Sequence, residues 1–175
     1  MKILSIKTFV LSNKLKEYKL PLPSYFYDGI LLLKIKTDQD TYSFIEISPY
    51  ATNIKKLKLI YDKKIIPFLK NQNVSNLLNL REKVKKFKFG NLISSVIIAS
   101  ITQIYFDLLS KFKKKTISKI LNKNLSIEKR KVKLYASGGM IFEDQDYNIL
   151  IEEALAAQEN GFYGWKFRPK TPNNN

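Results

Sequence analysis

The sequence predicts an α+β domain followed by the first strand, helix and strand of a parallel barrel. Strand-like segments fill about half of the first 47 residues, helical periodicity dominates residues 54–121, and a strand–helix–strand pattern occupies residues 131–172. Strands followed by helices are typical of an α+β domain, whereas a strand, a helix and a strand with short loops are typical of a parallel crossover. We therefore expect two domains, at 1–128 and 129–175.

The amino-terminal strands are expected to form a three-stranded antiparallel meander. Ile3–Leu11 alternates as a strand does, and Gly29–Lys36 is rich in β-forming residues. Tyr42–Ile47 follows across a turn at Asp38–Asp40, so the last two segments predict a hairpin.

Helices follow the meander. Asn53 is a candidate cap for a helix over Ile54–Ile66, which Pro67 is expected to close, and Ser75 is a candidate cap for a second helix that runs to about residue 86. Together with a third and a short fourth helix, these segments predict a helical bundle.

The third helix is expected from about residue 94 to residue 113, and its apolar character raises the question whether it spans a membrane. The uncharged run Phe89–Phe106 has about the length of a membrane span, but its serines, Asn91, Thr102 and Gln103 are polar for lipid. We interpret the run as a buried helix, and we expect no membrane partner. Thr116–Leu121 is expected to be a short helix that precedes a polar linker.

The last 45 residues carry the strand–helix–strand pattern. Lys131–Ala136 alternates as a strand, and Ser137–Gly139 is interpreted as a turn. A helix is expected from Tyr147, with Asn160 and Gly161 at its end, and Phe162–Arg168 is expected to form the second strand. We expect the two strands to be parallel and buried on both faces.

Composition excludes several chemistries. The chain has no cysteine and no histidine, which removes disulfides, thiolate metal sites and histidine-based catalysis. The net charge of +16 would favour a polyanionic partner, but Arg81, Arg130 and Arg168 are the only arginines. Because lysine lacks the planar fork that reads bases and phosphates, we interpret the charge mainly as solvated surface and do not favour nucleic-acid recognition.

Glu143, Asp144 and Asp146 could suggest a metal cluster. They precede a predicted helix, however, where acidic side chains complement the helix dipole, and Asp144 or Asp146 can cap it. We therefore assign no metal ligands in this chain.

Taken in order, these segments resemble the enolase superfamily, in its mandelate racemase and muconate lactonizing enzyme branch. The residues that carry the resemblance are Lys131–Gly139 as the first barrel strand, Glu152–Phe162 as the first barrel helix and its turn, Ala99–Ile101 with Asp107–Leu109 as the long helix of the capping domain, and Glu46 at the end of its third strand. The glycines that usually precede this glutamate are missing.

The resemblance implies a site at the end of the second barrel strand. Family members commonly carry Lys-x-Lys there, and the second lysine abstracts the proton α to a carboxylate. Lys166 takes the first position and Arg168 the second. Neutralising an arginine at pH 7 would cost about 8 kcal/mol, against about 4.6 kcal/mol for an unperturbed lysine, so Arg168 is a carboxylate clamp rather than a base. Lys170 follows Pro169 and is a further candidate.

The resemblance also implies Mg²⁺, held by carboxylates on the third, fourth and fifth barrel strands, which these 175 residues do not include. We therefore expect an N-terminal fragment of a dehydratase or racemase that acts on small carboxylates or sugar acids, inactive by itself and binding no metal specifically. We expect a cytoplasmic protein, which could be a homo-oligomer. The resemblance implies substrate-closing loops that contain Tyr25, Tyr27 and Tyr50, and these tyrosines could equally pack the capping domain onto the barrel. The alternative is a non-catalytic basic module that binds nucleic acid or anionic surfaces.

Overall fold

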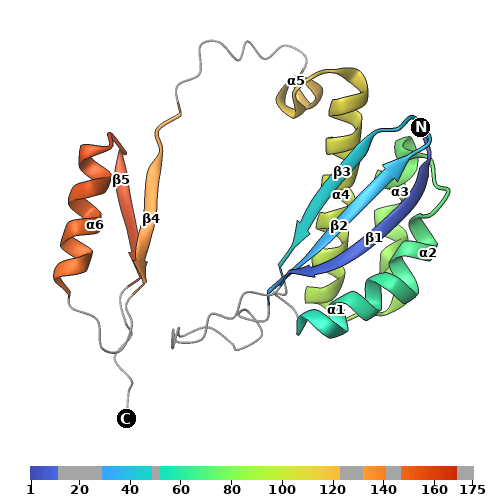
Figure 1. The fold of residues 1–175 in the computed structure, drawn as a ribbon, viewed down its shortest axis with the longest axis horizontal. Coiled ribbons are helices and arrows are strands. Elements are labelled where there is room, and N and C mark those ends of the chain that lie inside the picture. The colour runs from blue at the N-terminus through green and yellow to red at the C-terminus, as the bar shows by residue number, and fades with distance from the viewer. Residues whose placement is uncertain (12–28, 49–51, 123–131, 141–146, 169–175) are drawn as a thin grey trace. The chain divides into compact units, whose positions relative to one another are not determined.

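The computed structural model describes residues 1–11, 29–48, 52–122, 132–140 and 147–168. These residues belong to two compact units. The first contains a three-stranded antiparallel sheet with helices, and the second contains two parallel strands with one helix (Figure 1). The predicted fold class, an α+β domain followed by a strand–helix–strand unit, is confirmed.

The sheet of the first unit is the predicted meander. Its strands are β1 (Ile3–Leu11), β2 (Ile30–Thr37) and β3 (Tyr42–Ile47), and they pair antiparallel in the order β1-β2-β3. Alternate side chains of β2 face the helices and are fully buried, as the period of a half-buried strand requires. Figure 1 shows the helices of this unit on one face of the sheet.

The first helical segment begins where the sequence predicts. Its Asn53 side chain accepts a hydrogen bond from the Lys56 N–H at 2.8 Å. The prediction that Pro67 closes this segment is wrong, because the chain continues as α1 (Ile54–Ile60), a π-helical turn (Tyr61–Ile65) and α2 (Ile66–Leu69).

The π-helical turn explains how the chain passes the proline. The Ile66 N–H bonds to the carbonyl of Tyr61, five residues earlier, and Pro67 then lies in the first turn of α2. A proline in a first turn withholds an N–H that needs no partner within the helix, so it does not interrupt the hydrogen bonding there.

The second helical segment has a different cap from the one predicted. Asn73, rather than Ser75, has the extended backbone of a cap, and its side chain accepts a hydrogen bond from the Ser75 N–H at 3.2 Å. The segment comprises a 3₁₀ turn (Val74–Asn76), α3 (Leu77–Lys83) and a second 3₁₀ turn (Val84–Phe87). Ser75 lies inside the first 3₁₀ turn, and its own N–H donates to the Asn73 side chain. Ser75 is therefore not the cap.

The long helix α4 (Asn91–Lys113) begins three residues before the predicted start. It is the one helix of the described residues that is long and apolar enough to cross a membrane by length and composition. One stripe of α4 is buried in the core of the first unit, at Ile97, Ser100, Ile101, Ile104 and Leu108. The interpretation as a core helix agrees with this burial. Helix α5 (Ile117–Leu121) follows, with Thr116 as its cap.

The second unit consists of β4 (Tyr135–Met140), α6 (Asn148–Glu159) and β5 (Gly164–Arg168), and its strands are parallel as predicted. The predicted turn at Ser137–Gly139 is wrong, because these residues lie within β4. The pairing of β4 with β5 is irregular between Ser137 and Met140, and Gly139 has a φ of +64°. A glycine with positive φ makes such an irregularity without leaving the strand.

Helix α6 ends as predicted, with Gly161 at a φ of +76° and the Asn160 side chain donating to the Ala156 carbonyl at 2.7 Å. The predicted caps Asp144 and Asp146 lie outside the described residues. The expectation of a sheet buried on both faces is wrong for the described unit, since Tyr135 of β4 is 60% exposed. A single helix can cover only one face of two strands.

Candidate functional site

Lys166 lies near the carboxyl end of β5 and is exposed. Its neighbours in the strand, Trp165 and Phe167, stack their rings with centroids 5.1 Å apart. Trp165 also lines a small cavity together with Ala156 and Ala157 of α6. Because side chains alternate along a strand, Lys166 projects from the opposite face of the sheet, away from α6.

Ser137 of β4 is the register partner of Lys166, so an exposed hydroxyl and an exposed ammonium group lie on neighbouring strands. Arg168 ends β5, where its backbone is paired with Met140. Its side chain lies outside the described part of the structure. The described site is therefore a single cation on an open sheet face, which can attract a carboxylate.

The carboxyl end of β4 is tied to α6 by Glu153, which sequence reasoning did not identify. The Gly139 N–H donates to the Glu153 Oε2 at 2.6 Å. This carboxylate satisfies a backbone donor at the irregularity of β4, where pairing with β5 is interrupted. The two glycines within a strand pattern were the available signal, because such glycines often mark irregular pairing.

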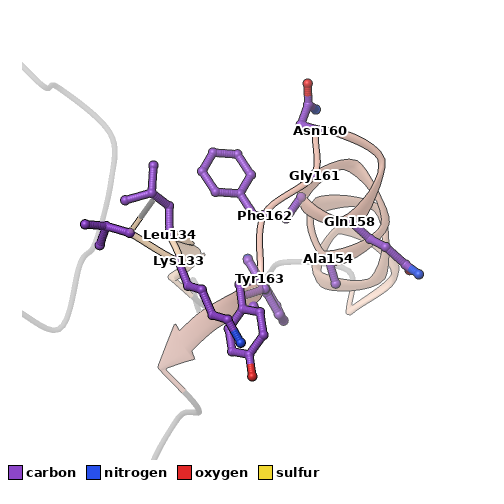
Figure 2. A pocket seen from close by; sticks show the side chains of 12 residues that line it. Lys133, Leu134, Ala154, Gln158, Asn160, Gly161, Phe162 and Tyr163 are labelled. Atoms are coloured by element: carbon purple, nitrogen blue, oxygen red, sulfur yellow. The ribbon is translucent and has the colours of Figure 1, made fainter. Parts of the chain in front are cut away.

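A cavity of the second unit lies at the other end of the strands. It has a volume of about 850 Å³ and is lined by residues that precede each strand and by the last turn of α6, among them Lys133, Phe162 and Tyr163 (Figure 2). The Lys133 ammonium lies 4.0 Å from the centre of the Tyr163 ring. Lys166 lines neither this cavity nor the one beneath α6.

The remaining candidate residues lie outside the described residues. They are the loop tyrosines Tyr25, Tyr27 and Tyr50, the further lysine Lys170, and the acidic group Glu143, Asp144 and Asp146. Within the described residues, no group of three or more Asp or Glu side chains could hold a metal ion. The described residues therefore do not form a magnesium site.

Comparison of the sequence with family models and with curated proteins finds no match. Solved structures do match. An enolase superfamily member from a Polaromonas species aligns with 97% of this chain at 20% identity and a TM-score of 0.77. A mandelate racemase/muconate lactonizing enzyme from a marine actinobacterium, in complex with magnesium, aligns with 95% at 18% identity and a TM-score of 0.71. The 3,6-anhydro-D-galactonate cycloisomerase from Zobellia galactanivorans aligns with 95% at 22% identity and a TM-score of 0.71.

The fold thus defines an α+β capping domain continued by the first strands of a parallel α/β unit. It is the fold of the enolase superfamily in its mandelate racemase/muconate lactonizing enzyme branch, and the resemblance predicted from the sequence is confirmed at the level of the fold. The chain spans less than half the length of the structures it matches, between 42% and 44% for these three.

Proposed function

We propose that these residues are the capping domain and the first strand–helix–strand unit of an enzyme resembling mandelate racemase, with the division between the two near residue 128. The whole enzyme would remove a proton α to the carboxylate of a small acid or sugar acid, assisted by Mg²⁺. The enzyme would be cytoplasmic, and it could be a homo-oligomer. Its main support is that single alignments of 95–97% of the chain run through both the capping domain and the parallel unit.

Lys166 and Arg168 are the proposed site residues. The exposed position of Lys166 near the carboxyl end of β5 supports this assignment, because parallel α/β barrels carry their active sites at that end of the strands. In this proposal Arg168 holds the substrate carboxylate, since a guanidinium stays charged at neutral pH. Tyr25, Tyr27 and Tyr50 would then contact the substrate from the loops of the capping domain.

The proposal predicts that the 175-residue chain alone turns over no sugar acid, because the described residues hold no magnesium site. The test compares this chain with a protein that also contains whatever coding sequence continues its reading frame in the source DNA. We expect magnesium-dependent turnover only in the longer protein, with a loss of activity in the Lys166→Ala variant. Turnover by the 175 residues alone, or a stop codon directly after them, would contradict the proposal.

A further inference from the structure

The outer face of the β1–β3 sheet carries lysines and aromatic rings in a regular grid. Thr8 of β1 faces the helices, because its hydroxyl donates to Asp62 at 2.8 Å. The residues on either side of Thr8, Lys7 and Phe9, therefore project outward. The register then places three rows on the outer face: Ser5–Lys36–Tyr42, Lys7–Lys34–Phe44 and Phe9–Leu32–Glu46.

The middle row sets two like charges side by side. Lys7 and Lys34 are direct register partners on adjacent strands, an arrangement that destabilises a sheet. Within the described residues neither lysine forms an ion pair with a carboxylate, whereas Lys36 of the first row pairs with Asp40 at 3.0 Å. An anion bound between Lys7 and Lys34 would relieve this repulsion.

Aromatic rings lie beside the lysines and are open to solvent. Phe44 is 55% exposed and Phe9 is 42% exposed, so both rings are accessible to a ligand from solvent. The Lys34 ammonium lies 5.6 Å from the centre of the Phe44 ring and 5.3 Å from that of Tyr42. The face thus offers cations and flat apolar rings within a few ångströms of one another.

We propose that this face binds single-stranded nucleic acid, with phosphates at Lys7 and Lys34 and bases stacked on Phe44 and Phe9. Cationic grooves interleaved with aromatic platforms bind single strands without sequence preference. The scarcity of arginine argues against reading base edges, but stacking requires only a ring, and lysine serves as a point charge for phosphate. Glu46 lies in the third row and limits the basic surface to the first two rows. This inference is independent of the proposed enzymatic function.

The first test measures binding of the full chain to a fluorescent oligothymidylate of about twelve nucleotides as salt is varied. Removing two phosphate contacts with Lys7→Ala and Lys34→Ala together should reduce the slope of log K against log salt by about 1.4. The control variant changes Lys55 and Lys63, which are exposed on the helical side, to alanine. Because the chain carries a charge of +16, both variants lose some affinity, and an equal loss in the two would overturn the proposal.

The second test separates stacking from simple charge attraction. Phe44→Leu keeps an apolar side chain but removes the ring, and it should weaken oligothymidylate binding by about fivefold or more. Binding of inorganic polyphosphate, which has no bases, should be unchanged by this substitution. Equal effects on both ligands would overturn the proposal. Binding to phosphatidylserine vesicles is measured with the same variants. A loss of binding confined to these vesicles would also overturn the proposal, because it would show that the face binds an anionic membrane.

Discussion

The hydroxyl of Tyr61 donates a hydrogen bond to the Ser100 Oγ across the core of the first unit, at 2.7 Å. The direction of this bond follows from a second one, because the Ser100 hydroxyl uses its single proton to donate to the Ile97 carbonyl at 2.8 Å. Tyr61 begins the π-helical turn that precedes Pro67, and Ser100 lies in the middle of α4. The pair therefore connects the first helical segment to the central helix through a fully buried contact.

Removal of the two partners of this bond is expected to have unequal costs. Tyr61→Phe leaves Ser100 bonded to Ile97 and should lower the free energy of unfolding by about 1 kcal/mol. Ser100→Ala leaves the buried Tyr61 hydroxyl without its acceptor and should cost about 1–3 kcal/mol. Urea unfolding of the two variants at pH 7 measures both values. A larger loss in Tyr61→Phe would contradict the assigned direction of the bond.

Stability should fall at alkaline pH because of the same tyrosine. Burial raises the pKa of Tyr61 above its ordinary value of 10.0. The folded chain then keeps a proton that the unfolded chain releases above about pH 10. The contribution of Tyr61 is therefore fully present below pH 10 and decreases as the pH rises further.

The measurement compares urea unfolding of the wild type and of Tyr61→Phe on both sides of pH 10. Other tyrosines contribute equally to both proteins, so the difference between the two isolates Tyr61. The variant should lose less stability than the wild type above pH 10. Parallel pH profiles would show that Tyr61 titrates normally in the folded chain.

Helix α4 should respond to substitution as a core helix does. Ile101 is fully buried, and Ile101→Ala should lower the free energy of unfolding by about 2–5 kcal/mol through lost burial and the cavity it leaves. Leu92 lies on the same helix but is 69% exposed, so Leu92→Ala should change stability by less than about 0.5 kcal/mol. Thermal unfolding followed by circular dichroism distinguishes these outcomes, and equal effects would contradict the burial of this stripe.

Gly139 should tolerate no side chain. A Cβ there would clash with the Cβ of Phe167, and its positive φ is unfavourable for other residues. Gly164 of the adjacent strand is the matched control, because a Cβ there would make an ordinary contact with Tyr135 at 3.8 Å. Trp165 is the only tryptophan of the chain, so its fluorescence reports on the second unit alone.

We expect Gly139→Ala to shift the fluorescence of Trp165 and to lower its denaturation midpoint, whereas Gly164→Ala should leave both nearly unchanged. The same spectra should show the effect of Glu153→Gln, which weakens the hydrogen bond from the Gly139 N–H by removing the charge of its acceptor. An unchanged fluorescence signal in Gly139→Ala would contradict the close approach of the two strands at this residue.

Local patterns were sufficient for most of the secondary structure. The alternation of Ile3–Leu11, the cap at Asn53 and the parallel unit with its glycine stop at Gly161 were all predicted, because each depends on residues within one turn or one strand of each other. The resemblance to the enolase superfamily was also visible in these local segments, and the solved structures confirm the fold. The assignment of Lys166 and Arg168 as site residues stays a prediction.

Tertiary contacts decided the features that local patterns could not. Ser137–Gly139 continues a strand because Glu153, fourteen residues later, accepts the Gly139 N–H. The segment that contains Pro67 continues as a helix because the π-helical turn before it shifts the proline into a first turn. Lys7 lies beside Lys34 because the register of β1 on β2 makes them cross-strand neighbours. In each case the favourable conformation depends on where a hydrogen-bond or packing partner lies in space, and the identity of neighbouring residues does not specify that position.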